Sequence, residues 1–227
     1  MSTSRPRNTL GRLALVGAAI VLLSGCGSAR PGVAAEVGAD TISVDAVDEL
    51  AGDVCTLQES LPEGGANQPQ TTSGLAARDG ALQSLILRSI ADQMADDYGF
   101  TAGNDFESQV DRVRLQFETV DQDKVEAALP AYASIPYFID IMRQIGETTG
   151  DDLADNQALT AGIKKAQQWQ EDHPITTNPM FGSFSIGDQE IESERDDLAF
   201  PASQSAKDAS SGSADYYASL PESQRCG

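Results

Sequence analysis

The sequence predicts a mainly α-helical domain with short β-strands at its beginning and end. Apolar residues recur at intervals of three and four over most of the segment 44–171, a spacing typical of helices that pack on a core. Short runs compatible with strands occur only near residues 33–43 and 175–186. The 227 residues are 40% hydrophobic and 22% charged, which suits one domain with a core and a tail.

The domain is expected to begin with a hairpin that leads into a helix. Val33–Val37 and residues 41–43 are candidate strands, joined by a turn at 38–40. Ser43 is suited to cap a helix from Val44 to about Cys55, because its side chain can accept from a backbone N–H of the first turn. One face of this helix carries Val44, Val47, Leu50, Ala51 and Val54.

Three more helices are predicted after a polar loop. The first spans about 74–98 and ends at Gly99, a residue suited to the left-handed conformation at a helix end. The second spans about 105–117. A short third helix at 121–129 is expected to end where Pro130 breaks it. The long first helix carries the apolar stripe Leu75, Leu82, Leu85, Ile86, Ile90, Met94 and Tyr98.

The second half of the domain contains its most apolar stretch, residues 131–147. A helix over about 156–171 follows and ends at His173–Pro174. Residues 175–178 and 181–186 are candidate strands. We expect the hairpin near residue 181 to pair with the hairpin at the start of the domain and bring its two ends together.

The first 26 residues have the pattern of an export signal. Arg5, Arg7 and Arg12 precede an apolar run of about 11 residues that ends at Leu23, whereas a membrane-spanning helix needs about 20. The run leads into Leu-Ser-Gly-Cys, which resembles the lipobox of bacterial lipoproteins and ends at Cys26. That resemblance implies cleavage before Cys26, attachment of diacylglycerol to its thiol and often N-acylation with palmitate. The alternative is an ordinary secretory peptide with a chance cysteine.

A lipidated Cys26 would hold the protein at the cell membrane, on the extracytoplasmic face. Two or more acyl chains anchor a protein stably, whereas one holds it only marginally. Cleavage removes three arginines and no acid, so the mature chain is more negative than the full chain with its net charge of -20, and anionic lipid repels it. The connector after Cys26 reaches about 20 Å when extended, so the domain is expected to stand close to the membrane.

The chain divides into four parts on these grounds. They are a signal peptide (1–25), a lipidated connector (26–32), a helical domain (33–186) and an acidic low-complexity tail (187–227). The tail is rich in Asp, Glu, Ser and Ala and has little to bury. Most of it, residues 188–219, is therefore expected to be disordered or loosely attached.

Cys55 and Cys226 remain as an even pair once Cys26 carries lipid. Thiols outside the cytoplasm tend to be oxidised, so we predict a disulfide between the two. It would tie the first helix to the tail and, in the chain-entropy model, add up to about 5 kcal/mol to the free energy of unfolding. Two free thiols, or pairing with another chain, are the alternatives. The spacing is not the CxxC of catalytic redox sites.

The composition excludes several kinds of site. With 35 acidic and 15 basic residues, the chain lacks the basic face that nucleic-acid binding requires. Its single histidine, His173, excludes sites with two imidazoles, and three cysteines cannot form a four-thiolate zinc or iron–sulfur site. The acidic runs lack the DxDxDG pattern of a calcium loop. We therefore predict no metal, no cofactor, no catalytic residue and no enzyme activity.

Residues 33–48 (VAAEVGADTISVDAVD) are similar to the start of the N-terminal chaperone domain of SurA, PrsA and the trigger-factor-like foldases. In this family a strand, a turn, a second strand and a helix with early acids follow in that order, and the helix 82–98 with Gly99 continues the likeness. The segment Asn178–Phe184 and the terminal Leu-Pro-Glu-Ser-Gln-Arg-Cys are similar to actinobacterial lipoproteins with such a domain. The likeness covers 33–186. The chain lacks room for a parvulin isomerase domain, whose sites use two histidines.

The resemblance implies a chaperone-like protein that binds unfolded exported polypeptides on apolar surface, without isomerase catalysis. The candidate peptide-binding residues, which exceed what one buried face requires, are Leu115, Tyr132, Ile135, Tyr137, Phe138 and Met142. These side chains could instead belong to the core or to a dimer face. The alternative functions are a structural or adaptor lipoprotein that holds one envelope partner, and a solute receptor or enzyme, for which the strands are too few.

Overall fold

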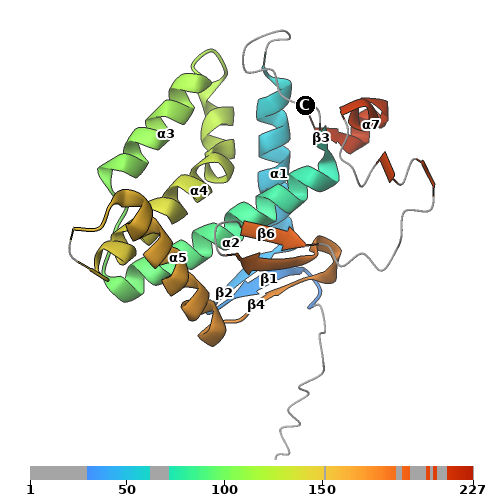
Figure 1. The fold of residues 1–227 in the computed structure, drawn as a ribbon. Helices are drawn as coiled ribbons and strands as arrows, with labels where there is room; N and C mark the ends of the chain where they lie inside the picture. The colour runs from blue at the N-terminus through green and yellow to red at the C-terminus, as the bar shows by residue number, and fades with distance from the viewer. Residues whose placement is uncertain are drawn as a thin grey trace, which may run out of the picture.

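The computed structural model of the chain is mainly helical with a few short strands, which confirms the predicted fold class (Figure 1). It describes residues 30–61, 72–150, 152–187, 191–194, 203–204, 207–208 and 214–226. The predicted signal peptide, Cys26 and the first residues of the connector lie outside the described residues. Among the described helices, none combines the length and the apolar character needed to cross a bilayer.

The strands at the beginning and the end of the domain meet in one antiparallel sheet. β1 (Val33–Val37) lies in the middle, between β2 (Asp40–Ser43) and β4 (Ile175–Thr177). Val37 faces Asp40 on one side and Ile175 on the other. The predicted meeting of the two ends of the domain is confirmed.

The partner of β1 differs from the predicted one. The strand expected at 181–186 forms as β5 (Ser183–Ile186) but pairs with β6 (Ile191–Glu194), which lies in the acidic tail. A 3-10 turn, η1 (Pro179–Phe181), separates β4 from β5, and Gly182 after it has a φ of 78°, which glycine adopts without strain. Because the chain turns here, β4 and β5 enter different sheets.

The first helix, α1 (Val44–Glu59), begins where predicted and continues past Cys55, its expected end. Ser43 caps it as expected, since its Oγ accepts from the Ala46 N–H at 3.0 Å. The extension places Leu57 in the last turn, where it is fully buried. Burial of this leucine favours continuation of the helix.

The central helix, α2 (Gly74–Tyr98), has the predicted bounds and crosses the middle of the molecule in Figure 1. It ends at Gly99, whose φ of 72° confirms the predicted left-handed cap. The centre of its apolar stripe is buried, including Ile86 and Met94. The two ends of the stripe, Leu75 and Tyr98, are exposed.

The helix α3 (Asn104–Gln116) agrees with the sequence, but the predicted break at Pro130 is wrong. A single helix, α4 (Gln122–Glu147), contains both Pro130 and Pro136. Each proline removes one helical hydrogen bond, which is unfavourable by about 3 kcal/mol in a helix interior. Burial of apolar side chains on both sides of Pro130 offsets this, since each large one contributes about 1.5–3 kcal/mol. The buried residues are Val125, Ala128, Phe138, Ile141, Met142 and Ile145.

The last long helix, α5 (Asp155–Asp172), packs on the end of α4 at very short range. A Cβ atom on Gly146 would lie 1.7 Å from the carbonyl oxygen of Ala158. A Cβ atom on Gly162 would lie 1.8 Å from the carbonyl oxygen of Met142. Only glycine therefore fits at either position.

The end of α5 lies at His173, as predicted. Its Nδ1 lies 2.9 Å from the carbonyl oxygen of Trp169, and its ring stacks on the indole with centroids 4.2 Å apart. These contacts support a structural role at the helix end.

Among the described residues, the core consists of a large cluster and a small one. The large cluster lies between the three-stranded sheet and the helices α1, α2, α4 and α5. The small cluster joins the ends of α1 and α3 to the start of α4, and its members are Leu57, Phe117, Val120, Val125 and Ala128.

The C-terminal segment returns to the body of the domain. It contains α7 (Ala214–Ser219), η2 (Glu222–Gln224) and β7 (Arg225–Cys226). β7 pairs with β3 (Thr72–Ser73), the two residues that precede α2. In Figure 1 the segment lies beside β3 and the start of α2. The acidic tail therefore carries ordered elements at residues 191–194 and at its C-terminal end.

Candidate peptide-binding groove

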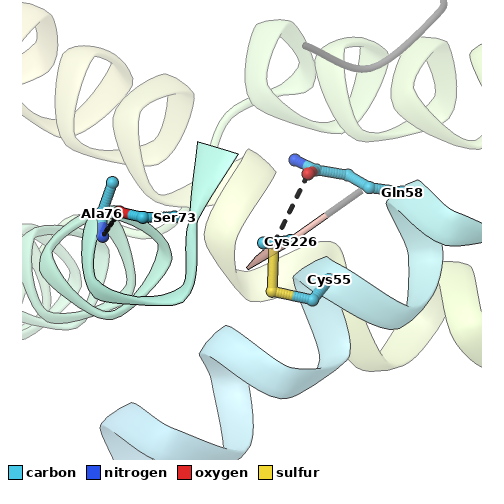
Figure 2. Close-up of a disulfide and its surroundings, with 5 residues drawn as sticks. All are labelled: Cys55, Gln58, Ser73, Ala76 and Cys226. Carbon is cyan, nitrogen blue, oxygen red and sulfur yellow. Dashed lines mark hydrogen bonds between the residues drawn. A yellow bond between two sulfur atoms is a disulfide. The ribbon is translucent and has the colours of Figure 1, made fainter. Parts of the chain in front are cut away.

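The predicted disulfide between Cys55 and Cys226 is present (Figure 2). It joins the C-terminal half of α1 to β7, with the two Cα atoms 4.8 Å apart. Cys226 is fully buried, whereas Cys55 is partly exposed. The bond therefore attaches the end of the chain to the first helix, as expected.

The start of α2 lies on the other side of Cys226. Thr72 of β3 pairs with Cys226, and Ser73 pairs with Arg225. Ser73 also caps α2, because its Oγ accepts from the Ala76 N–H at 3.1 Å (Figure 2). The pair β3–β7 therefore bridges the end of α1 and the beginning of α2.

A groove of about 270 Å³ opens between α1, α2 and α4, next to this bridge. It is lined by Val54, Gln58, Thr72, Ala76, Ala77, Gly80, Ala81, Ser84, Ala131 and Tyr132. None of these residues is charged, although the chain carries 35 acids. We refer to it as the α1–α2–α4 groove.

The α2 side of the groove is built from very small residues. Gly80 is exposed, and a Cβ atom placed on it would meet nothing within 4 Å. Deeper in the groove, the Ser84 Oγ donates to the Ala131 carbonyl at 3.3 Å and so joins α2 to α4. The helices thus hold the groove open, and the small side chains leave its volume free for a ligand.

Tyr132 and Gln58 supply the polar groups at the wall of the groove. Burial raises the pKa of the Tyr132 phenol, and a hydrogen bond from the Gln58 side chain lowers it in part. The Tyr132 ring packs edge-on against Phe117, with centroids 5.4 Å apart. The Gln58 Oε1 lies 3.6 Å from the Cys226 Sγ, which carries no hydrogen within the disulfide, so this is a packing contact.

The structure separates the six candidate peptide-binding residues. Only Tyr132 lines the groove. Leu115 and Ile135 are exposed, by 64% and 46%, on α3 and α4. Phe138 and Met142 are buried in the large core cluster, and this favours the core interpretation for them.

Tyr137, the sixth candidate, is also buried in the large cluster, between helices. Its ring packs edge-on against Phe106 at 5.2 Å, and the Arg88 guanidinium lies over it at 4.1 Å. Burial raises the pKa of Tyr137 to about 12, and a hydrogen bond with Asp92 contributes to the increase. This tyrosine therefore holds α2, α3 and α4 together and is not a surface residue.

The small residues on the α2 side of the groove were not predicted from the sequence. The predicted site residues are large apolar side chains, whereas α2 lines the groove with Ala76, Ala77, Gly80, Ala81 and Ser84. The signal was the run Gly74-Leu-Ala-Ala-Arg-Asp-Gly-Ala81, in which Leu75 is the only large aliphatic residue.

No family model, curated protein or solved structure matches this chain. Within the described ranges, no group of three or more His, Cys, Asp or Glu side chains could hold a metal ion.

Proposed function

We propose that this protein is a lipid-anchored, extracytoplasmic, chaperone-like protein that binds exported unfolded polypeptides and catalyses no reaction. The α1–α2–α4 groove is its client-binding site. The observation that carries the proposal is an uncharged groove in a strongly acidic chain. A surface without charge accepts the apolar side chains and backbone of an unfolded segment without desolvating an ion.

The groove is large enough to hold side chains of a client. At about 30 Å³ for each water in the liquid, 270 Å³ corresponds to roughly nine waters. Pockets for small-molecule ligands typically measure about 300–1,000 Å³, so this groove lies just below that range. One or two bulky apolar side chains of a client would fill it. Gln58 and Tyr132 supply polar groups for the backbone beside them.

Charge restricts which segments would bind. The net charge of -20 repels acidic polypeptides and attracts basic ones over a range set by the ionic strength. We therefore expect clients in which apolar residues are flanked by neutral or basic residues. The same charge would keep the loaded protein soluble.

Lipid attachment at Cys26 would place the groove at the outer face of the membrane. β1 begins at Val33, directly after the connector 26–32, which spans about 20 Å when extended. The body would then meet polypeptides as they emerge from the membrane. This localisation depends on the lipobox, and mass spectrometry of the mature N-terminus tests it directly.

The function is tested by filling the groove. In Gly80→Trp an indole enters open space on α2, and helix stability is preserved because glycine is a poor helix former. Purified residues 27–227 should suppress aggregation of an unfolded client, and Gly80→Trp should abolish the suppression. Gly52→Trp is the matched control, since Gly52 is also exposed, helical and free of neighbours but lies on α1 outside the groove.

Equal suppression by both variants, or none by the parent protein, would refute the client-binding groove. A photocrosslinker at position 80 in living cells separates a chaperone from an adaptor. A chaperone yields many crosslinked partners, whereas an adaptor yields one partner in fixed stoichiometry.

A further inference from the structure

A second cavity, of about 450 Å³, lies at the start of α2. Its walls come from α2 and from the C-terminal segment. The lining residues are Ser73, Gly74, Leu75, Arg78, Tyr216, Tyr217, Leu220, Ser223 and Gln224. Like the groove, it is mostly uncharged, and its one cation, Arg78, is paired with Asp48.

The strand pair β3–β7 stands between the groove and this cavity. Thr72 lines the groove and Ser73 lines the cavity, as expected because successive strand residues point to opposite faces. On the other side of the pair, Cys226 contacts Gln58 in the groove wall, and Gln224 of η2, which precedes β7, lines the cavity. Figure 2 shows Cys226 between α1 and the end of β3.

The disulfide is the strongest attachment of β7 to the body of the domain. The pairing of β7 with β3 extends over two residues, too few for independent stability. The ion pair between Arg225 and Glu222, at 4.0 Å, lies within the C-terminal segment and does not attach it to the body. The bond to Cys55 is the covalent attachment of β7, beside the packing of α7 on β3 and of η2 on α2.

We propose that the Cys55–Cys226 disulfide is a redox latch that controls access to the client site. When the bond is reduced, β7 leaves β3, the groove opens onto the α2 wall of the cavity, and the edge of β3 becomes free. An extended client segment then pairs with that edge in place of β7. The latch is a conformational device, and its effect on clients rests on the proposed function.

The reduction is an ordinary thiol–disulfide exchange with a protein dithiol. One thiolate of the dithiol attacks the Sγ of Cys55, the partly exposed partner, and Cys226 leaves as a thiolate that takes up a proton from water. The second thiol of the reductant attacks the mixed disulfide and releases Cys55. The dithiol supplies both electrons and ends as a disulfide.

Release of β7 favours client binding for two reasons. An unpaired strand edge presents N–H and C=O groups that an extended peptide can satisfy by strand addition. The α2 wall of the cavity, which includes Leu75, also becomes accessible beside the groove once the C-terminal segment leaves it. We expect the Kd for an unfolded client to fall by roughly five-fold on reduction, the size expected from one or two additional backbone hydrogen bonds.

Hydrogen exchange measured by mass spectrometry tests the latch without any client. The chain as cells produce it is compared in its oxidised form and after a dithiol reductant. We expect amides of 72–76 and 214–226 to lose protection, while those of the body, such as 82–95 and 137–146, keep it. Unchanged protection everywhere would overturn the latch. Loss of protection throughout would also overturn it, because the disulfide would then stabilise the whole domain.

Client binding is measured on the same samples with a fluorescent, permanently carboxymethylated unfolded polypeptide. Tighter binding after reduction, reproduced without reductant by the double variant Cys55→Ser/Cys226→Ser, supports the latch. Equal affinity in both states overturns its role in access. If the exchange pattern changes as expected but neither state binds the client, the proposed function fails while the conformational latch stands.

Discussion

Gly146 of α4 and Gly162 of α5 each lie against the backbone of the other helix. The missing Cβ atoms would fall 1.7 Å and 1.8 Å from carbonyl oxygens of the facing helix. Because backbone atoms cannot rotate away as a side chain does, the two glycines set the distance between the helices. This contact holds the end of α4 on the large core cluster, whereas the first half of α4 carries one wall of the groove.

Substitution at this crossing should destabilise the protein strongly. We expect Gly162→Ala to lower the free energy of unfolding by about 3 kcal/mol, the upper part of the range for overpacking, because the helices must separate. Urea denaturation measures the change. Gly52→Ala is the control, and it should raise the free energy of unfolding by about 0.5–1 kcal/mol, since that glycine is helical with open space around it. A small loss in Gly162→Ala would contradict the close crossing.

The buried carboxylate of Asp140 should anchor α3. Its Oδ2 accepts from the Gly103 N–H at 2.8 Å, at the start of α3, and from the Gln144 Nε2 at 2.9 Å. Because Gly103 has no side chain to cap the helix, Asp140 supplies the cap from α4. We expect Asp140→Ala to reduce the free energy of unfolding by about 2 kcal/mol.

Hydrogen exchange in α3 checks the location of this effect. In Asp140→Ala, amides in the first turns of α3 should lose protection from hydrogen exchange before amides of α2 do. Asp97→Ala, at an exposed acid on α2, is the control and should change the free energy of unfolding by less than about 0.5 kcal/mol. Equal losses in the two variants would show that Asp140 does not cap α3.

Stability should fall at alkaline pH because of Tyr137. Its pKa is raised to about 12 in the folded protein, first by burial and then by Asp92, against an ordinary value of 10.0. Between these two values the unfolded chain releases the proton while the folded chain keeps it. The stabilisation is therefore complete below pH 10 and is lost as the pH rises towards 12.

The measurement is the free energy of unfolding of the parent and of Tyr137→Phe from pH 8 to 11. The variant should lose less stability over this range than the parent. Tyr98→Phe, at an exposed tyrosine, should follow the parent curve. A Tyr137→Phe curve parallel to that of the parent would contradict the raised pKa.

Two neighbouring residues of α4 should respond very differently to truncation. Phe138 is 2% exposed and Ile135 is 46% exposed. Phe138→Ala should lower the free energy of unfolding by about 3–5 kcal/mol, because it leaves a cavity in the large cluster. Ile135→Ala should lower it by less than about 1 kcal/mol. Thermal unfolding measures both, and a similar effect of the two would contradict the orientation of α4.

Several helix boundaries could be predicted because their signals are local. Ser43 caps α1 and Gly99 ends α2 through contacts within one turn, so residue type and position were sufficient. The predicted end of the helix at Pro130 was wrong. The proline does weaken the helix locally, but burial of apolar side chains on both sides of it outweighs that cost. The disulfide could be predicted because, of the three cysteines, Cys26 was assigned to lipid and the remaining two allow only one internal pairing.

The candidate site was predictable only in small part. Of the six apolar residues favoured from the sequence, one lines the groove, three are buried in the core, and two are exposed elsewhere. The stretch 131–147 is apolar enough to supply both a core and a surface, and periodicity alone does not distinguish the two. The orientation of α4 against its neighbouring helices decides which of these residues lie in the core and which lie at the surface.

The sequence by itself determined the helical class and most helix ends, and it carries the amino-terminal pattern from which export is predicted. Each of these depends on residues within a few positions of one another. Only the tertiary structure decided that α4 continues through Pro130, that small residues of α2 leave a groove against α1 and α4, and that β7 pairs with β3 beside it. These features arise from residues distant in the chain, whose packing energies no local pattern contains.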